Sequence, residues 1–160
     1  MRLVNHIGPD TYLQLEAAIE VSMDDVKVAW ERAYEELHQG LQGLSTEGTL
    51  YIVFGLQGAG KTTWINRNAP LLGTDCIFFD GPLPSREKRT RALAMASAAN
   101  IKSVAVWLDT PIELALERNA MRRGLANIKE EAIRHVQVQL QPPSTEEGFS
   151  RIIRVSSDQG

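Results

Sequence analysis

One octapeptide in this chain has the residue types and the spacing to hold the phosphates of a nucleotide. Residues 55–62 read Gly-Leu-Gln-Gly-Ala-Gly-Lys-Thr, which fits the pattern G-x-x-x-x-G-K-[ST]. Glycines allow such a loop to turn tightly and to point its backbone N–H groups at an anion. Lys61 would then reach the β- and γ-phosphates, and the hydroxyl of Thr62 would ligate Mg²⁺. The octapeptide therefore predicts a phosphate-binding loop for ATP and Mg²⁺.

Both flanks of the octapeptide agree with this interpretation. Residues 51–54 form a short β-branched and aromatic run, as a buried parallel strand does. The residues after Thr62 can continue as a helix, whose first N–H groups would add to the anion site. The nucleotide contacts that we expect are Gly55, Gln57, Gly58, Ala59, Gly60, Lys61, Thr62 and Thr63.

Two carboxylates are placed for a role beside this loop. Asp80 and Asp109 each end an apolar run that reads as a strand. Ligands of parallel sheets bind beyond the carboxyl ends of the strands, so both carboxylates and Gly55 are expected at one edge. Asp80, which Gly81 follows, is a candidate for a Mg²⁺ ligand or for the base that accepts a hydroxyl proton. The alternatives are that Asp80 orders a turn and that Asp109 only supports the start of a helix.

Arginines at the end of a predicted helix supply candidate cations. Arg118 and Arg122 are four residues apart and share one helix face, and Arg123 follows them. A lid that brings such cations over the γ-phosphate would stabilise phosphoryl transfer, although cations also favour a helix C-terminus without any ligand. A second basic cluster follows Asp80, where a phosphate contact by Arg89 and a solvated helix face are both open. Its members are Arg86, Lys88, Arg89 and Arg91.

The elements that must position these groups alternate along the chain. Pro70 is expected to stop the helix that follows the loop, and Thr110 to cap the helix that carries Arg118. The alternation predicts an α/β protein, a three-layer α/β/α P-loop NTPase fold with a parallel sheet and an N-terminal helical extension. The predicted strands are 51–54, 76–79, 103–108 and 151–155, and the predicted helices between and after them are 62–68, 84–99, 111–123 and 128–140.

The N-terminal part differs from the rest in charge. Residues 1–50 hold three basic and nine acidic residues, a net charge of −6, whereas the remainder carries +3. We therefore expect an acidic helical segment over 1–47 and a P-loop kinase-like domain over 48–160. The segment would contain one helix over 10–21 and a second that ends at Gly40. It either packs against the core or binds a protein partner, and its acidity disfavours contact with nucleic acid.

Composition excludes several other classes of protein. A chain of 160 residues with 43% hydrophobic content suits one domain with a real core. No apolar run approaches the roughly 20 residues of a membrane span, and the first residues lack the apolar stretch of a signal peptide. Cys76 lies alone in an apolar run and is expected to be buried, and three scattered histidines give no zinc spacing. These features indicate a cytoplasmic protein without membrane contact.

Three further motifs carry a resemblance to a known family. With the octapeptide, they make residues 50–156 resemble small P-loop kinases of the polynucleotide 5′-hydroxyl kinase type, which are AAA-type P-loop kinase-like ATP-binding proteins. The resemblance implies that Lys61 and Thr62 bind ATP–Mg²⁺, that Arg118 and Arg122 are lid arginines, and that Asp80 is the acidic residue beside the phosphate loop. The motifs are Asp80…Arg89, Leu108-Asp109-Thr110-Pro111-x-Glu113…Arg118-Asn119-x-x-Arg122, and Gln141-Pro142-Pro143…Glu146-Glu147-Gly148-Phe149.

The chain departs from this family on the acceptor side. Members that phosphorylate nucleic-acid ends usually carry Asp-x-x-Arg after an extra strand and helix. Between Thr63 and Cys76 there is room for one helix and a turn, and no arginine follows Asp75 three residues on. The sequence Asp80-Gly81-Pro82-Leu83 also replaces the family's polar Asp-x-Thr-Asn. Either Asp80 serves as the base as well, or the acceptor differs.

The sequence therefore predicts an ATP–Mg²⁺-dependent kinase that transfers the γ-phosphoryl group to a hydroxyl. The acceptor suggested by the resemblance is a polynucleotide 5′-hydroxyl, and a small-molecule hydroxyl is the alternative. Another class stays open, a nucleotide-binding switch or ATPase that a partner regulates through residues 1–47. A relative that binds nucleotide without turnover is a further alternative.

Overall fold

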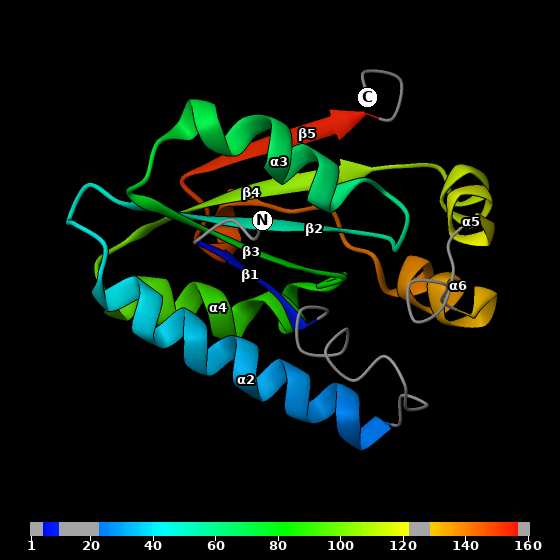
Figure 1. The fold of residues 1–160 in the computed structure, drawn as a ribbon, viewed down its shortest axis with the longest axis horizontal. Helices are drawn as coiled ribbons and strands as arrows, with labels where there is room; N and C mark the ends of the chain where they lie inside the picture. Colours follow the sequence, from blue (N-terminus) through cyan, green and yellow to red (C-terminus); the bar gives the residue numbers. More distant parts are fainter. Residues whose placement is uncertain (1–4, 10–22, 122–128, 157–160) are drawn as a thin grey trace.

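A five-stranded, wholly parallel sheet forms the centre of the protein (Figure 1). The computed structural model describes residues 5–9, 23–121 and 129–156. The strand order is β1-β3-β2-β4-β5. Four of these strands coincide with the predicted apolar runs, which confirms the α/β class with a parallel sheet. The strands are β1 (His6–Ile7), β2 (Thr49–Gly55), β3 (Cys76–Gly81), β4 (Lys102–Asp109) and β5 (Arg151–Ser156).

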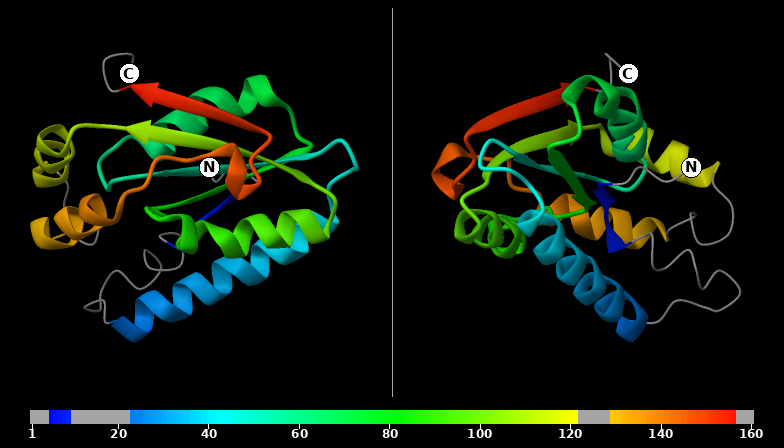
Figure 2. Two further views of the ribbon diagram at one scale, coloured as in Figure 1. Left: turned by 180° about the vertical axis from the view of Figure 1, so that it is seen from behind. Right: turned by 60° about the vertical axis from the view of Figure 1, so that its left-hand side comes forward.

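Helices cover both faces of this sheet (Figure 1). Helix α3 lies on one face, and α2 and α4 lie side by side on the other. Helices α5 and α6 lie beyond the carboxyl ends of the strands, as the two views of Figure 2 also show. None of the helices in the described ranges is both long and apolar enough to cross a membrane. The helices are α2 (Met23–Gln42), α3 (Lys61–Leu72), α4 (Arg86–Ala98), α5 (Ile112–Ala120), α6 (Glu130–Gln139) and the short 3-10 helix η2 (Thr145–Glu147).

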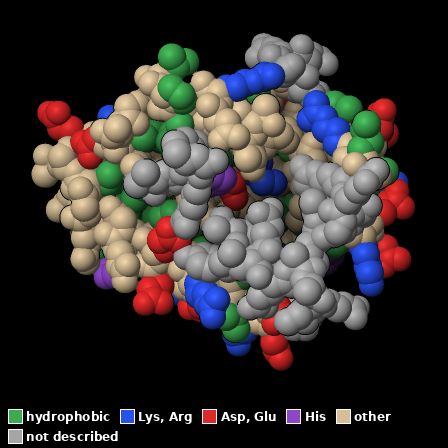
Figure 3. All heavy atoms as spheres, in the orientation of Figure 1, with side chains coloured by type: hydrophobic (Ala, Val, Ile, Leu, Met, Phe, Trp, Pro, Cys, Tyr) green, Lys and Arg blue, Asp and Glu red, His purple; other side chains and the backbone are tan. Residues whose placement is uncertain are grey.

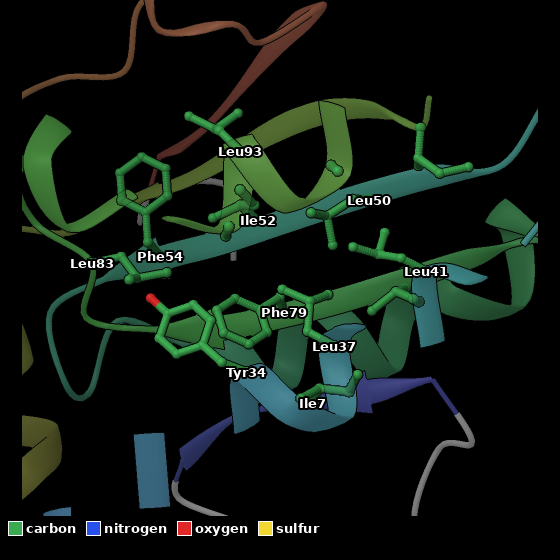
Figure 4. Packing of buried hydrophobic residues seen from close by; sticks show 14 of the residues in the cluster. Ile7, Tyr34, Leu37, Leu41, Leu50, Ile52, Phe54, Phe79, Leu83 and Leu93 are labelled. Carbon is green, nitrogen blue, oxygen red and sulfur yellow. The ribbon is translucent and has the colours of Figure 1, made fainter. Parts of the chain in front are cut away.

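Strand β2 is buried along its whole length because its two faces feed two different clusters. Side chains alternate along a strand, so Leu50, Ile52 and Phe54 face α2 and α4, whereas Tyr51 and Val53 face α3. Figure 4 shows the first cluster, in which side chains from β1, β2, β3, α2 and α4 point toward one another. The loop that follows β2 is thus anchored to the best-packed strand of the sheet.

The described part of the N-terminal segment belongs to this same core. Strand β1 pairs with β3, and Ile7 and Leu37 are buried in the cluster that β2 and β3 form. Arg91 of α4 binds Glu31 of α2 and stacks over the ring of Tyr34 at 4.1 Å. The sequence left two roles open for the segment, packing against the core and binding a protein partner. Helix α2 packs against the core. The helix predicted over 10–21 lies outside the described residues.

Two predicted helix ends are wrong. Helix α2 continues through Gly40 to Gln42, since the missing side chain allows the helix to approach β3; a Cβ on Gly40 would lie 2.9 Å from Cδ1 of Ile77. Helix α3 continues past Pro70 to Leu72. Leu72 packs against the cluster on that face, which offsets the backbone hydrogen bond that proline cannot make.

Arg89 is a structural residue, so both roles that the sequence left open for it, a phosphate contact and a place on a solvated helix face, are wrong. Its side chain is 0% exposed and donates two hydrogen bonds to the carboxylate of Glu147, at 2.9 and 3.1 Å. The carbonyls of Leu83 and Gln141 also accept from it, and its guanidinium lies 4.6 Å from the ring centre of Phe54. A buried guanidinium needs such acceptors in place of water. Arg89 therefore ties the segment after α6 to the strand that precedes the glycine loop.

We expect Glu147→Ala to lower the free energy of unfolding by about 3 kcal/mol, because it leaves the buried charge of Arg89 without its partner. Chemical denaturation at neutral pH measures the effect. The matched control is Glu146→Ala, since the neighbouring carboxylate is 84% exposed. This control is expected to change stability by less than about 0.5 kcal/mol. Equal stability of the two variants would contradict the structural role of Arg89.

Asp75 lies at the amino end of β3, at the opposite edge of the sheet from the glycine loop, so it cannot serve the acceptor. Its carboxylate accepts hydrogen bonds from the backbone N–H of Ser45, at 2.9 Å, and from the Ser45 hydroxyl. These bonds favour the charged form and lower the pKa of Asp75 from its ordinary value. The thiol of the next residue, Cys76, is buried as predicted, and burial raises its pKa.

We expect Asp75→Asn to lower the melting temperature at neutral pH, with a difference from the wild type that shrinks in acid. A carboxyl group with a lowered pKa in the folded state contributes stability above its unfolded pKa. That contribution is lost as the pH falls from about 4 through the folded value. Thermal unfolding from pH 7 to pH 3 measures the trend, with Glu117→Gln as an exposed control. A constant difference across this range would contradict the assignment.

Candidate functional site

The loop over residues 55–62, called the glycine loop from here on, connects the carboxyl end of β2 to the first residue of α3. Gly58 and Gly60 have φ values of 87° and 96°, which residues with a Cβ rarely adopt. The first bond of α3 runs from the N–H of Trp64 to the carbonyl of Gly60, 2.9 Å apart, and no side chain caps this helix end. The helix N–H groups before Trp64 therefore have no partner within the helix, and they give this end a partial positive charge.

The start of α5 braces the glycine loop. The hydroxyl of Thr110 donates to the carbonyl of Ala59 at 3.3 Å. The backbone of Ala115 lies so close that a Cβ on Gly58 would be 2.6 Å from its carbonyl oxygen. The prediction that Thr110 caps α5 is wrong, since no side-chain cap bond is present at the start of that helix. Its hydroxyl holds the loop instead, so β4 and α5 fix the shape of the loop.

Two cations lie on the glycine loop. The ammonium of Lys61 donates to the carbonyls of Gly55 and Leu56, at 3.0 and 3.1 Å. The guanidinium of Arg118, at the end of α5, donates to the carbonyl of Gly58 at 3.2 Å. The structure therefore brings together these two predicted site residues, which are 57 positions apart in the sequence. The other predicted lid arginines, Arg122 and Arg123, lie outside the described residues.

The remaining predicted nucleotide contacts fall into two groups. Thr62 and Thr63 are exposed in the first turn of α3, where their hydroxyls can meet a ligand. Ala59 is buried and packs against the core on the α3 side of the sheet. Oε1 of Gln57 is buried, and within the described ranges it has no hydrogen-bond partner. A buried amide oxygen of this kind is a site where a ligand or water can donate.

A cavity of about 740 Å³ opens between the glycine loop, α3, α5 and β5. This volume lies within the range of about 300–1,000 Å³ that small-ligand sites show. Three arginines from three different elements line it, namely Arg67, Arg118 and Arg154, together with the indole of Trp64. Such a lining suits an anionic ligand that also carries a flat ring. The sequence analysis missed Arg67, Arg154 and Trp64, because no local pattern shows that α3 and β5 face one cavity.

Asp80 lies at the same edge of the sheet, one strand away from the glycine loop. It pairs in register with Val53 on β2, and the alternation along β3 directs its side chain to the face that α3 covers. The side chain is buried, and its Oδ2 lies 2.5 Å from Nε2 of His6 on β1. His6 is a site residue that the sequence analysis missed. A two-residue strand has no periodicity that could have shown it.

Asp109 has a structural partner at this edge. Its carboxylate accepts from Nε of Arg154 at 2.8 Å, and the guanidinium of Arg154 also lies over the ring of Trp107 at 5.4 Å. The pair joins the carboxyl ends of β4 and β5. Asp109 thereby holds Arg154 at the wall of the cavity, a role different from support of a helix start, the alternative that the sequence left open.

The described ranges contain no group of three or more His, Cys, Asp or Glu side chains that could hold a metal ion by themselves. A cation at this site would therefore be shared between the Thr62 hydroxyl, water and the oxygens of an anionic ligand, which is how Mg²⁺ usually binds beside phosphates. Searches against protein-family models and against curated proteins find no match for this chain.

Proposed function

We propose that the protein is an ATP–Mg²⁺-dependent kinase of the P-loop type, which transfers the γ-phosphoryl group of ATP to a hydroxyl. The observation that carries this proposal is the meeting of Lys61 and Arg118 on one glycine loop, with Asp80 at the same sheet edge. Phosphoryl transfer is catalysed mainly by positioning and by cations around the phosphates. A loop, a lysine, an arginine and a carboxylate in this arrangement supply those needs.

The residues of the site fit a nucleoside triphosphate. The glycine loop and the uncapped N-terminus of α3 offer N–H groups to the phosphates, and the arginine-lined cavity has room for the nucleoside. Lys61 and Arg118 now donate to loop carbonyls, which are neutral acceptors. Phosphate oxygens are charged and accept more strongly, so both side chains are expected to turn to the phosphates when ATP binds.

Asp80 is proposed as the base rather than as a metal ligand. Mg²⁺ usually keeps several waters and needs room for six ligands. The carboxylate of Asp80 is buried, holds a hydrogen bond from His6, and lies against the backbone of Gly8. A single hydroxyl needs less space there than a hydrated ion. Mg²⁺, held by the Thr62 hydroxyl and the nucleotide, would neutralise charge on the phosphates.

The proposed reaction is an in-line displacement. The acceptor oxygen forms a bond to the γ-phosphorus while the bond from that phosphorus to the bridging oxygen breaks, and the electron pair stays on ADP. The proton of the acceptor hydroxyl passes to the carboxylate of Asp80. Arg118 contacts the glycine loop from the end of α5. From this position its guanidinium would stabilise the negative charge that develops on the transferred group.

The acceptor carries a hydroxyl, and two classes of acceptor fit the site. The family resemblance favours a polynucleotide 5′-hydroxyl. On the face shown in Figure 3, acidic and basic side chains are interspersed rather than gathered into one basic field. A nucleic-acid acceptor would therefore bind through the nucleotides near its 5′ end rather than along its length. The second class of acceptor is a small molecule with a hydroxyl group.

The test is turnover of γ-labelled ATP with Mg²⁺, in the presence and absence of a 5′-hydroxyl oligonucleotide, with Lys61→Ala as the control. Label on the oligonucleotide supports an end kinase. If phosphate release depends on Lys61 but is the same with and without the oligonucleotide, a small-molecule hydroxyl is the acceptor to test next. Tight ATP binding with no consumption above the Lys61→Ala control, with the oligonucleotide and with small-molecule hydroxyls, contradicts a kinase and supports a relative that binds nucleotide without turnover.

A partner-regulated ATPase is the second candidate, and a groove between α2 and α4 favours it. This groove has a volume of about 630 Å³ and is lined by charged side chains and the half-exposed Val28. A protein that binds there would contact residues 23–42. Under this alternative, adding the partner protein increases the rate of phosphate release from γ-labelled ATP. No hydroxyl compound becomes labelled.

A further inference from the structure

The edge of the sheet beside β3 is completed by the N-terminal part of the chain. His6 and Ile7 pair with Phe78 and Phe79 in parallel register. The link from α3 to β3 is only the short stretch 73–75 at the amino edge, so it offers no residues to the carboxyl edge where Asp80 lies. Residues 6–9 are therefore the part of the described chain that lies next to Asp80 on the side away from the glycine loop.

Both sides of the Asp80 carboxylate touch this N-terminal strand and its continuation. Nε2 of His6 lies 2.5 Å from Oδ2. A Cβ on Gly8 would lie 2.9 Å from the Asp80 carbonyl oxygen and 3.2 Å from its carboxyl carbon, and closer still to Oδ1. Ile7 is buried in the core on the other face of the sheet, which fixes His6 on the same face as α3. The contact is thus held by strand register and by core packing.

We infer that His6 is the positioning residue for the carboxylate of Asp80. This inference rests on the proposed kinase function. The imidazole holds Oδ2 and Gly8 lies against Oδ1, so these two contacts set the direction in which the carboxylate meets the acceptor proton. An aspartate without that bond would rotate about its side-chain torsions, and the hydroxyl would lose its alignment with the γ-phosphorus.

This arrangement also accounts for the missing acceptor unit between α3 and β3. The place beyond β3 in the sheet is filled by β1, and α2 covers the core behind it. The N-terminal strand supplies the histidine that holds the Asp80 carboxylate there.

The test compares His6→Phe with His6→Gln. Phenylalanine keeps the ring shape and has no donor, whereas glutamine places an amide donor near the position of Nε2. Consumption of γ-labelled ATP is measured with Mg²⁺ and a 5′-hydroxyl oligonucleotide, as label on the oligonucleotide plus label released as phosphate. We expect His6→Phe to lower kcat by about 10- to 100-fold with an unchanged KM for ATP, and His6→Gln to restore most of the loss.

The matched control is His38→Phe, since His38 is exposed on α2 and lies outside the site. Thermal unfolding shows whether each variant is folded, and His6→Met, which also lacks a donor, replaces a phenylalanine variant that unfolds. If the wild type turns over ATP and His6→Phe does so at the same rate, the role of His6 is overturned and the kinase proposal stands. The same conclusion follows if His6→Phe is slow and His6→Gln is equally slow. No wild-type turnover above Lys61→Ala, with the oligonucleotide or with small-molecule hydroxyls, overturns the kinase proposal itself.

Discussion

Asp80→Asn is expected to lower the rate of phosphoryl transfer by about 10³-fold while ATP binds as before, because the amide cannot accept the hydroxyl proton. The substitution keeps the size of the side chain, and its amide oxygen can still accept the hydrogen bond from His6. The change therefore removes the base and leaves the geometry in place. Single-turnover transfer from γ-labelled ATP gives the rate, and calorimetric titration gives the affinity for ATP.

The same variant separates the two candidate functions. For a kinase, transfer falls and nucleotide affinity does not. For a switch in which Asp80 belongs to the nucleotide site, binding and hydrolysis change together. Asp24→Asn, an exposed carboxylate on α2, serves as the control. Wild-type transfer by Asp80→Asn would remove Asp80 from the chemistry.

Arg118→Ala is expected to lower kcat by about 10³-fold, or about 4 kcal/mol of transition-state stabilisation. Its guanidinium lies 3.2 Å from the carbonyl of Gly58, within the loop that would hold the phosphates. Charge grows on the transferred group as the reaction proceeds, so a cation at this place acts mainly in the transition state. The loss should therefore appear in kcat more than in KM for ATP.

A lysine at the same position refines this prediction. Arg118→Lys keeps the charge but loses the planar fork of the guanidinium, so an intermediate rate is expected. Arg134→Ala is the control, since Arg134 is exposed on α6 and pairs with Glu130. If Arg118→Ala turned over ATP as fast as this control, the contact with Gly58 would have no catalytic role.

Most of the sheet was predictable because β2, β3, β4 and β5 are each apolar or β-branched runs with clear ends. Strand β1 was not, since two residues are too few to show a period. Helix ends failed where tertiary contacts outweighed local signals. Gly40 and Pro70 read as stops in the sequence, yet one allows α2 to approach β3 and the other lies in a turn that packs on the core.

The positions of the candidate site residues in the fold were predictable where these residues are contiguous or end a strand. The glycine loop is a continuous octapeptide, and Asp80 follows from the rule that strands present ligands at their carboxyl ends. Arg89 was misread because its burial depends on Glu147, which lies 58 positions later in the chain. His6 and Asp80 are 74 positions apart, and neither residue shows its partner locally.

The place of β1 in the sheet has a consequence for the order of folding. Synthesis runs from the N-terminus, so β1 emerges well before β3, the strand with which it pairs. The glycine loop also emerges before Asp80. Residues 55–62 therefore leave the ribosome while His6 still has no carboxylate to pair with, and the candidate site is complete only after β3, β4 and α5 have joined the sheet.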